Sequence, residues 1–333
     1  MLPLLATLAL AAAPEVALLD SAGSTTHLRF QPLGAASLAP VAATFTHGDG
    51  STVLGALLPG RRVVLATAIV GRPRDESFGA ALFRLEPGGP ARQLVDRVAV
   101  STRPLVLENG RVFVQRGRPG AAAEERERVD LLTVDEVDPD SGRTRTVYEA
   151  HGFTTFLAGA VGRELIVYEV TPSGARLVAV HVDSLGVRAL AALPPLAFDF
   201  TVDAPRRRVV FTLGQPGEDA WRVVSVDIKS GALETLARGP SVALVPAVLP
   251  DGRVAYAPGP GEGLRVAGDG ARLLAAQGPG FERVRGVVKG VAVGLHEVPG
   301  DFPRLFSVTL SDGRPLDTAF PRDARLDVAG VAP

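Results

Sequence analysis

A short apolar segment recurs along the whole chain, and its spacing limits the folds that the chain can adopt. Successive copies start 37 to 53 residues apart, on average about 46, which is close to the period of a four-stranded propeller blade. The copies begin at Val16, Val63, Val112, Leu165, Val209, Val254 and Val291. The repeat therefore predicts one supersecondary unit copied around a ring.

The rest of each repeat has the pattern of three further strands. A strand with alternating apolar and polar residues follows the apolar segment, then a turn with Asp and Gly, then a third strand, as in VVSVDIKSGALETL. Alternation on both sides of such a turn is typical of a β-hairpin. A fourth segment, such as TVLGALL, RPLVLE, FDFTV or VALVPAV, leads into the next repeat. Four antiparallel strands per repeat predict an all-β chain folded as a β-propeller.

The two ends of the chain predict how the ring closes. Only 20 residues follow the last turn glycine, Gly313, and LDVAGVA within them has the pattern of an innermost strand. The N-terminal repeat, in contrast, starts directly at its second strand. We therefore expect the C-terminal strand to complete the N-terminal blade, so that residues 14–333 form a single seven-bladed propeller without open sheet edges. Six or eight blades remain alternatives, because boundaries read from a sequence shift by several residues.

Residues 1–13 have the composition of a secretory leader: a short apolar run that ends in small residues. The Lys or Arg that usually precedes such a run is missing, so a buried N-terminal strand and a misplaced start codon are the alternatives. Export would make the protein periplasmic or secreted. No other stretch reaches the roughly 18 apolar residues that a membrane span needs, so we expect none.

The charge balance and the composition exclude several classes. Lys and Arg number 35 against 36 Asp and Glu, which lacks the basic excess of a nucleic-acid binder. The chain has no cysteine, so disulfides, thiolate metal sites and cysteine nucleophiles are excluded.

Some of the turns resemble those of a known superfamily. VDIKSGALETL (226–236), VDPDSGRTRTVY (137–148) and PDGRVAY (250–256) are similar to the repeats of TolB-like and YncE-like propellers. The resemblance extends over most of residues 15–333 as a repeat pattern and is strong in two or three repeats. It implies an exported binding or assembly module, with some enzymes among the relatives, and a fold alone does not determine function.

The sequence contains no recognisable catalytic or metal-binding motif. The chain has neither a GxSxG elbow nor an HExxH metal motif, and its glycine runs lack the Lys-Ser/Thr ending of a phosphate loop. Asp135, Glu136, Asp138 and Asp140 surround Gly142 like calcium ligands, but their spacing differs from the calcium loop, and a turn whose aspartates bond their own backbone is favoured. We expect no metal and no cofactor.

Two charged residues lie in segments that we expect to line the central channel: Asp199 in FDFTV and Arg285 in VRGVV. A buried charge needs a partner, so each is interpreted first as a paired channel residue and second as a ligand contact.

The length of the repeat varies most between the second and third strands, where the longest insertions collect on one rim. Because loops on a rigid scaffold often carry function, we expect a monomeric, non-catalytic propeller that binds a protein or cell-surface ligand through this rim. Its candidate contacts are Arg72, Arg74, Asp75, Arg116, Arg118, Glu218, Asp219, Trp221, His296, Asp301 and Phe302.

Two other functions remain open. One is a propeller enzyme, such as a hydrolase, lactonase or lyase, with a metal at the channel mouth; for this role His296 beside Glu297, expected in a loop, is the histidine that a structural role explains least. The other is a purely structural part of an envelope complex.

Overall fold

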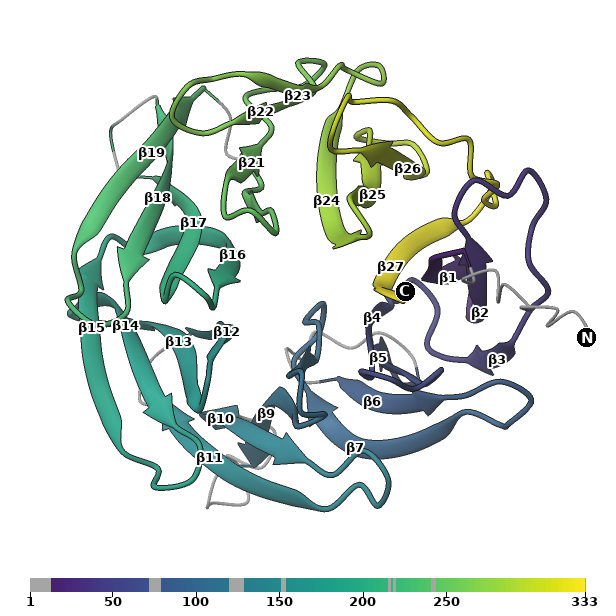
Figure 1. Ribbon diagram of the computed structural model, residues 1–333. Helices are drawn as coiled ribbons and strands as arrows, with labels where there is room; N and C mark the ends of the chain where they lie inside the picture. Colours follow the sequence, from purple (N-terminus) through teal and green to yellow (C-terminus); the bar gives the residue numbers. More distant parts are fainter. Residues whose placement is uncertain are drawn as a thin grey trace, which may run out of the picture.

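The computed structural model describes residues 13–71, 79–119, 129–150, 154–214, 217, 220–240 and 244–332. Within these ranges all regular secondary structure is β, in 27 strands, which confirms the all-β prediction. Figure 1 shows the sheets following one another around a ring.

Neighbouring strands pair antiparallel in six sheets. The first has the order β27 (Arg325–Ala332), β1 (Glu15–Ala22), β2 (Thr25–Pro32) and β3 (Ala43–Thr46). The second contains β4 (Leu54–Leu57), β5 (Val64–Ile69), β6 (Ala80–Leu85), β7 (Arg92–Val98), β8 (Leu105–Val106), β9 (Val112–Pro119), β10 (Val129–Val137) and β11 (Thr144–Ala150).

The remaining sheets follow the sequence order. They are formed by β12 (Thr154–Val161), β13 (Glu164–Thr171), β14 (Gly174–His181) and β15 (Val187–Leu193); by β16 (Leu196–Asp203), β17 (Arg208–Gly214), β18 (Trp221–Asp227) and β19 (Leu233–Gly239); by β20 (Ala247–Val248), β21 (Val254–Tyr256), β22 (Leu264–Val266) and β23 (Arg272–Leu274); and by β24 (Phe281–Val288), β25 (Val291–Glu297) and β26 (Arg304–Thr309).

The four-stranded repeat is not uniform. The second sheet has eight strands, and its two halves are joined where β7 pairs with β9 through Val98 and Arg116 alone. The last sheet has three strands, and beyond β26 there is only an isolated bridge from Val308 to Pro315. Proline has no N–H to donate, which limits a ladder at this position.

The C-terminal strand lies beside the N-terminal one. β27 pairs with β1 from Glu15 opposite Ala332 to Ser21 opposite Arg325, with one irregularity after Ala17. In Figure 1, β27 lies on the side of β1 that faces the centre of the ring.

The recurring apolar segments are strands whose two faces are both covered. Most residues of β1, β5, β13, β17 and β25 are buried, in continuous runs. The core is divided among the spaces between adjacent sheets; for example, Tyr168 of one sheet and Phe211 of the next belong to one cluster. A strand covered on both faces has an almost continuous apolar run instead of an alternating one.

The innermost strands approach each other closely, and glycine makes room for this. A Cβ atom on Gly330 of β27 would lie 2.7 Å from the Cβ atom of Leu57 in β4. The equivalent contact in β12 is between Gly159 and Val202 of β16, where the distance to Val202 Cγ2 would be 2.3 Å. Side chains at these two positions would overlap with the neighbouring sheet.

We therefore expect Gly330→Ala to lower the free energy of unfolding by about 1–3 kcal/mol, because Leu57 must shift. Gly186→Ala is the matched control, since its Cβ atom would meet nothing closer than Ser184 Oγ at 3.5 Å; it should stay within about 0.5 kcal/mol of the wild type. Urea unfolding followed by circular dichroism measures both. Equal effects of the two variants would contradict the close packing of β27 against β4.

Candidate functional site

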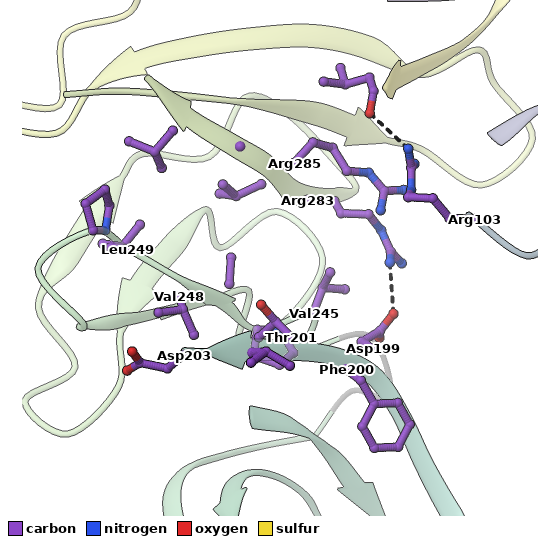
Figure 2. A pocket seen from close by; sticks show the side chains of 18 of the residues that line it. Arg103, Asp199, Phe200, Thr201, Asp203, Val245, Val248, Leu249, Arg283 and Arg285 are labelled. Atoms are coloured by element: carbon purple, nitrogen blue, oxygen red, sulfur yellow. Dashed lines mark hydrogen bonds and ion pairs between the residues drawn. The ribbon is translucent and has the colours of Figure 1, made fainter. Parts of the chain in front are cut away.

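A cavity of about 540 Å³ lies where β16, β20 and β24 meet (Figure 2). Its lining comes from these strands and the residues that flank β20, together with part of β27 and Arg103, which lies between β7 and β8. β20 has two residues, whereas β16 and β24 have eight each. The short strand leaves space between its two longer neighbours, and we call this space the recess.

The backbone of the recess is irregular. The pairing of β16 with β17 skips Asp199 and Phe200, and that of β24 with β25 skips Arg285. Such bulges redirect side chains and occur often beside binding sites. Asp199 has a φ of 53° and Val245 a φ of 39°; positive values are uncommon for non-glycine residues, above all for a β-branched one. Strain of this kind concentrates where a ligand is bound.

Three arginines gather at one end of the recess (Figure 2). Arg283 donates from Nη1 to Asp199 Oδ1 at 2.8 Å, and its Nε lies 3.3 Å from Glu297 Oε1. Arg285 has a weaker partner, because its Nη2 is 3.6 Å from the same oxygen of Glu297. The Nε atoms of both arginines are buried without a hydrogen bond.

The third arginine, Arg103, connects several sheets. Its Nη2 lies 2.5 Å from Asp327 Oδ1, and its Nη1 donates to the carbonyl oxygens of Val328, at 3.1 Å, and of Gly55. The other carboxylate oxygen of Asp327 accepts the backbone N–H of Gly55 at 2.8 Å. Arg103 is thus held mainly by β4 and β27.

The two arginines of β24 differ in how well their charge is compensated. Burial works to lower the pKa of Arg283, but the charges of Asp199 and Glu297 outweigh it, so its pKa is raised. Burial, reinforced by the charge of Arg103, lowers the pKa of Arg285 to about 10. Arg285 therefore stays protonated at neutral pH but lacks a full counter-charge.

Asp199 and Arg285, the two predicted channel residues, both line the recess. They do not pair with each other, because the partner of Asp199 is Arg283. Arg283 was not among the predicted channel residues, although it lies two positions before Arg285 and alternation places both on the same face of a strand. Arg103 was not singled out either, although it begins RPLVLE, one of the segments expected to form an inner strand; the structure places it just before β8.

Only some of the predicted rim residues lie in the part of the chain that the structure describes. Of the eleven, Arg72, Arg74, Asp75, Glu218 and Asp219, together with the side chain of Arg118, lie outside the described residues. Asp301 and Phe302 are exposed between β25 and β26. Trp221 is half-buried at the start of β18, and its ring centroid is 5.9 Å from that of Phe198. The guanidinium of Arg116 forms ion pairs with Asp96 and Asp135, which belong to the same sheet.

The placement of His296 in a loop was wrong. His296 lies in β25 and is 2% exposed, its Nδ1 is 3.1 Å from Glu282 Oε1, and its Nε2 is 3.2 Å from the carbonyl oxygen of Pro279. The residue is the sixth in a strand whose preceding five residues are buried. The strand therefore continues beyond the apolar segment VAVGL to Glu297, and the imidazole is buried with the rest of the strand.

The acidic residues at the end of β10 and in the turn after it have structural partners. Asp138 accepts the backbone N–H groups of Asp140 and Ser141 at 2.9 and 2.6 Å, as the turn interpretation predicted. Asp135 and Glu136 pair with arginines at 2.9 and 2.6 Å. Among the described residues, no group of three or more histidine, aspartate or glutamate side chains could hold a metal ion.

The part of the chain that the structure describes also contains no helix of the length and apolarity that a membrane crossing requires.

The known proteins that resemble this chain do so in their fold. No family model and no curated protein matches the chain. TolB from Acinetobacter baumannii superposes with a TM-score of 0.53 at 12% identity, over 95% of this chain and 67% of TolB. The β-propeller domain of the Trilobed protease from Pyrococcus furiosus gives 0.53 at 11% identity, over 81% of this chain and 84% of the domain.

A prolyl endopeptidase gives a TM-score of 0.59 at 15% identity, over 95% of this chain. This chain spans only half of that enzyme, 50% of its length. At these identities the likeness is informative about the fold alone. The chain has a TolB-like β-propeller fold.

Proposed function

We propose that this protein is a binding module that holds a ligand in the recess and does not convert it. The supporting observation is the arginine cluster, in which Arg285 lines the recess and has its carboxylate partner, Glu297, 3.6 Å away and shared with Arg283. An anion bound there would offset the repulsion among three guanidinium groups.

The chemistry of the lining favours binding over catalysis. Arginine stays protonated at neutral pH and so does not accept a proton from a substrate. The two carboxylates of the described lining are already paired, Asp199 with Arg283 and Asp203 with Arg208 at 3.0 Å. These groups can orient and neutralise a ligand, whereas a general base would have to be freed from its arginine first.

We further propose that the ring has seven blades and is closed by β27. This assignment divides the eight-stranded sheet at the pair between Val98 and Arg116, and it counts β24–β26 as a blade with a reduced outer strand. The pairing of β27 with β1 supports the closure. The proposal also retains export through the leader-like residues 1–13 and a partner surface on the rim, both of which depend largely on residues outside the described ranges.

Affinity capture of small molecules from a cell extract, read by mass spectrometry, tests the binding function. We expect the purified full chain to retain a compound that is recovered with unchanged mass. Ala247→Phe places a ring in the recess from β20 and should reduce retention about tenfold or more. Ala232→Phe, at an exposed turn position between β18 and β19, is the matched control and should retain as much as the wild type.

The enzyme alternative predicts other results in the same experiment. A compound released with an altered mass, together with a stoichiometric divalent ion in elemental analysis, would replace the binding proposal. Equal retention of the compound by Ala247→Phe and Ala232→Phe would show that the recess is not the binding site.

A further inference from the structure

We infer that the ligand of the recess is a monocarboxylic acid with an apolar body, an inference that rests on the proposed binding function. The first observation is how charge is paired around the recess. Three guanidinium groups line it, those of Arg103, Arg283 and Arg285, and the carboxylates that contact them belong to Asp327, Asp199 and Glu297. Glu297 is shared between Arg283 and Arg285, so one arginine has no carboxylate of its own, and a ligand with one negative charge would supply it.

The distances identify Arg285 as the arginine with the weakest partner. Asp203 is occupied from outside the recess by Arg208 at 3.0 Å, and Arg103 has Asp327 at 2.5 Å. Arg283 and Asp199 are 2.8 Å apart. The nearest carboxylate oxygen to Arg285 is 3.6 Å away and is shared with Arg283. A ligand anion therefore gains most when it contacts Arg285.

The same pattern discriminates against ligands with two negative charges. A phosphate monoester carries about −1.5 to −2 at neutral pH. Its second charge would lie near Asp199 and Glu297, which already neutralise Arg283, and like charges brought together oppose binding. A carboxylate instead matches the planar fork of a guanidinium with a single charge.

Part of the wall of the recess is apolar. The half-buried side chains that line it, and so keep some apolar surface exposed there, include Val202, Val248, Val284 and Val287. The volume of about 540 Å³ is within the range of small-molecule sites, where apolar walls surround a few orienting polar groups. A bare inorganic anion would leave this wall in contact with water, whereas an aliphatic or aromatic body would cover it.

Isothermal titration calorimetry of the full chain with four eight-carbon probes tests the inference. Octanoate is expected to bind, and octyl phosphate, octylamine and octanol to bind about tenfold more weakly or worse. Arg285→Met keeps an unbranched, flexible side chain but removes the guanidinium group and its charge, and we expect it to weaken octanoate binding about tenfold or more. Arg238→Gln, at an exposed arginine of the outer strand β19, is the control and should bind octanoate as the wild type does.

A second variant tests the apolar body independently of the charge. Ala247→Phe shortens the recess, so it should weaken octanoate by about tenfold or more while leaving acetate binding within about twofold. Thermal melting of each variant shows that it is folded.

The outcomes separate this inference from the function on which it rests. If octylamine or octyl phosphate binds as tightly as octanoate and Ala247→Phe abolishes that binding, the recess is a binding site but the ligand class is wrong. Octanoate binding that is unaffected by Arg285→Met also overturns the inference. If no probe and no compound from an extract binds in the recess, both proposals fail.

Discussion

Deleting residues 325–333 is expected to leave the chain without a cooperative unfolding transition. The deletion removes β27, whose Leu326 and Val328 are 6% and 2% exposed in the core between the first and last sheets. Burial of each such side chain contributes about 1.5–3 kcal/mol. The edge of β1 also loses its partner strand. The combined loss approaches the 5–15 kcal/mol by which a typical protein is stable.

Circular dichroism melting of the full and shortened chains measures the effect. Adding a peptide of residues 321–333 to the shortened chain is the control, because a strand that only completes a sheet can be supplied separately. We expect the peptide to restore part of the transition. A shortened chain that melts cooperatively near the temperature of the full chain would show that β27 does not hold the ring together.

Features that depend on neighbouring residues could be predicted from the sequence. The second strand of each repeat was found because a strand covered on both faces is apolar throughout. The turns were found because their chemistry is local: in the turn after β18, the N–H of Gly231 donates to the carbonyl oxygen of Asp227, and Gly231 has a φ of 74°. In the turn after β14, by contrast, the positive φ is taken by Leu185, at 60°, and not by the glycine that follows it.

The recess could not be predicted, because its contacts join distant parts of the chain. Asp199 and Arg283 are 84 positions apart, and Arg103 and Asp327 are 224 apart. The sequence marks Asp199 and Arg285 as charges in inner strands, but the choice of partner depends on how the sheets are placed around the ring. The bulges that direct Asp199 and Arg285 also have no simple sequence pattern.

The size of the recess has a similar origin. The apolar repeat predicts a strand near Val254, and β21 begins there. The inner strand before it was expected within VALVPAV, yet only Ala247 and Val248 pair, as β20. Pro246 and Pro250 flank this pair, and proline does not donate to a ladder. Proline therefore explains the short strand, although the cavity beside it requires knowledge of both neighbouring sheets.

The second large effect is expected for Arg103→Leu, which should lower the free energy of unfolding by about 3–5 kcal/mol. The side chain of Asp327 is 4% exposed, and Arg103 is its charge partner. Without the guanidinium, a buried carboxylate remains uncompensated, and the carbonyl oxygens of Gly55 and Val328 lose a donor. Chemical unfolding followed by fluorescence of the single tryptophan, Trp221, measures the loss.

A double-mutant cycle shows whether the pair acts as a unit. Arg103→Leu combined with Asp327→Leu removes both charges and should cost less than the sum of the single variants, with a coupling of about 0.5–3 kcal/mol. The pair of Arg61 and Asp140, 2.9 Å apart with Asp140 63% exposed, is the exposed counterpart, and Arg61→Leu should cost about 0–1 kcal/mol. If Arg103→Leu costs no more than Arg61→Leu, the contact with Arg103 does not hold β27 in place, and β27 must then be held by its pairing with β1 and by packing alone.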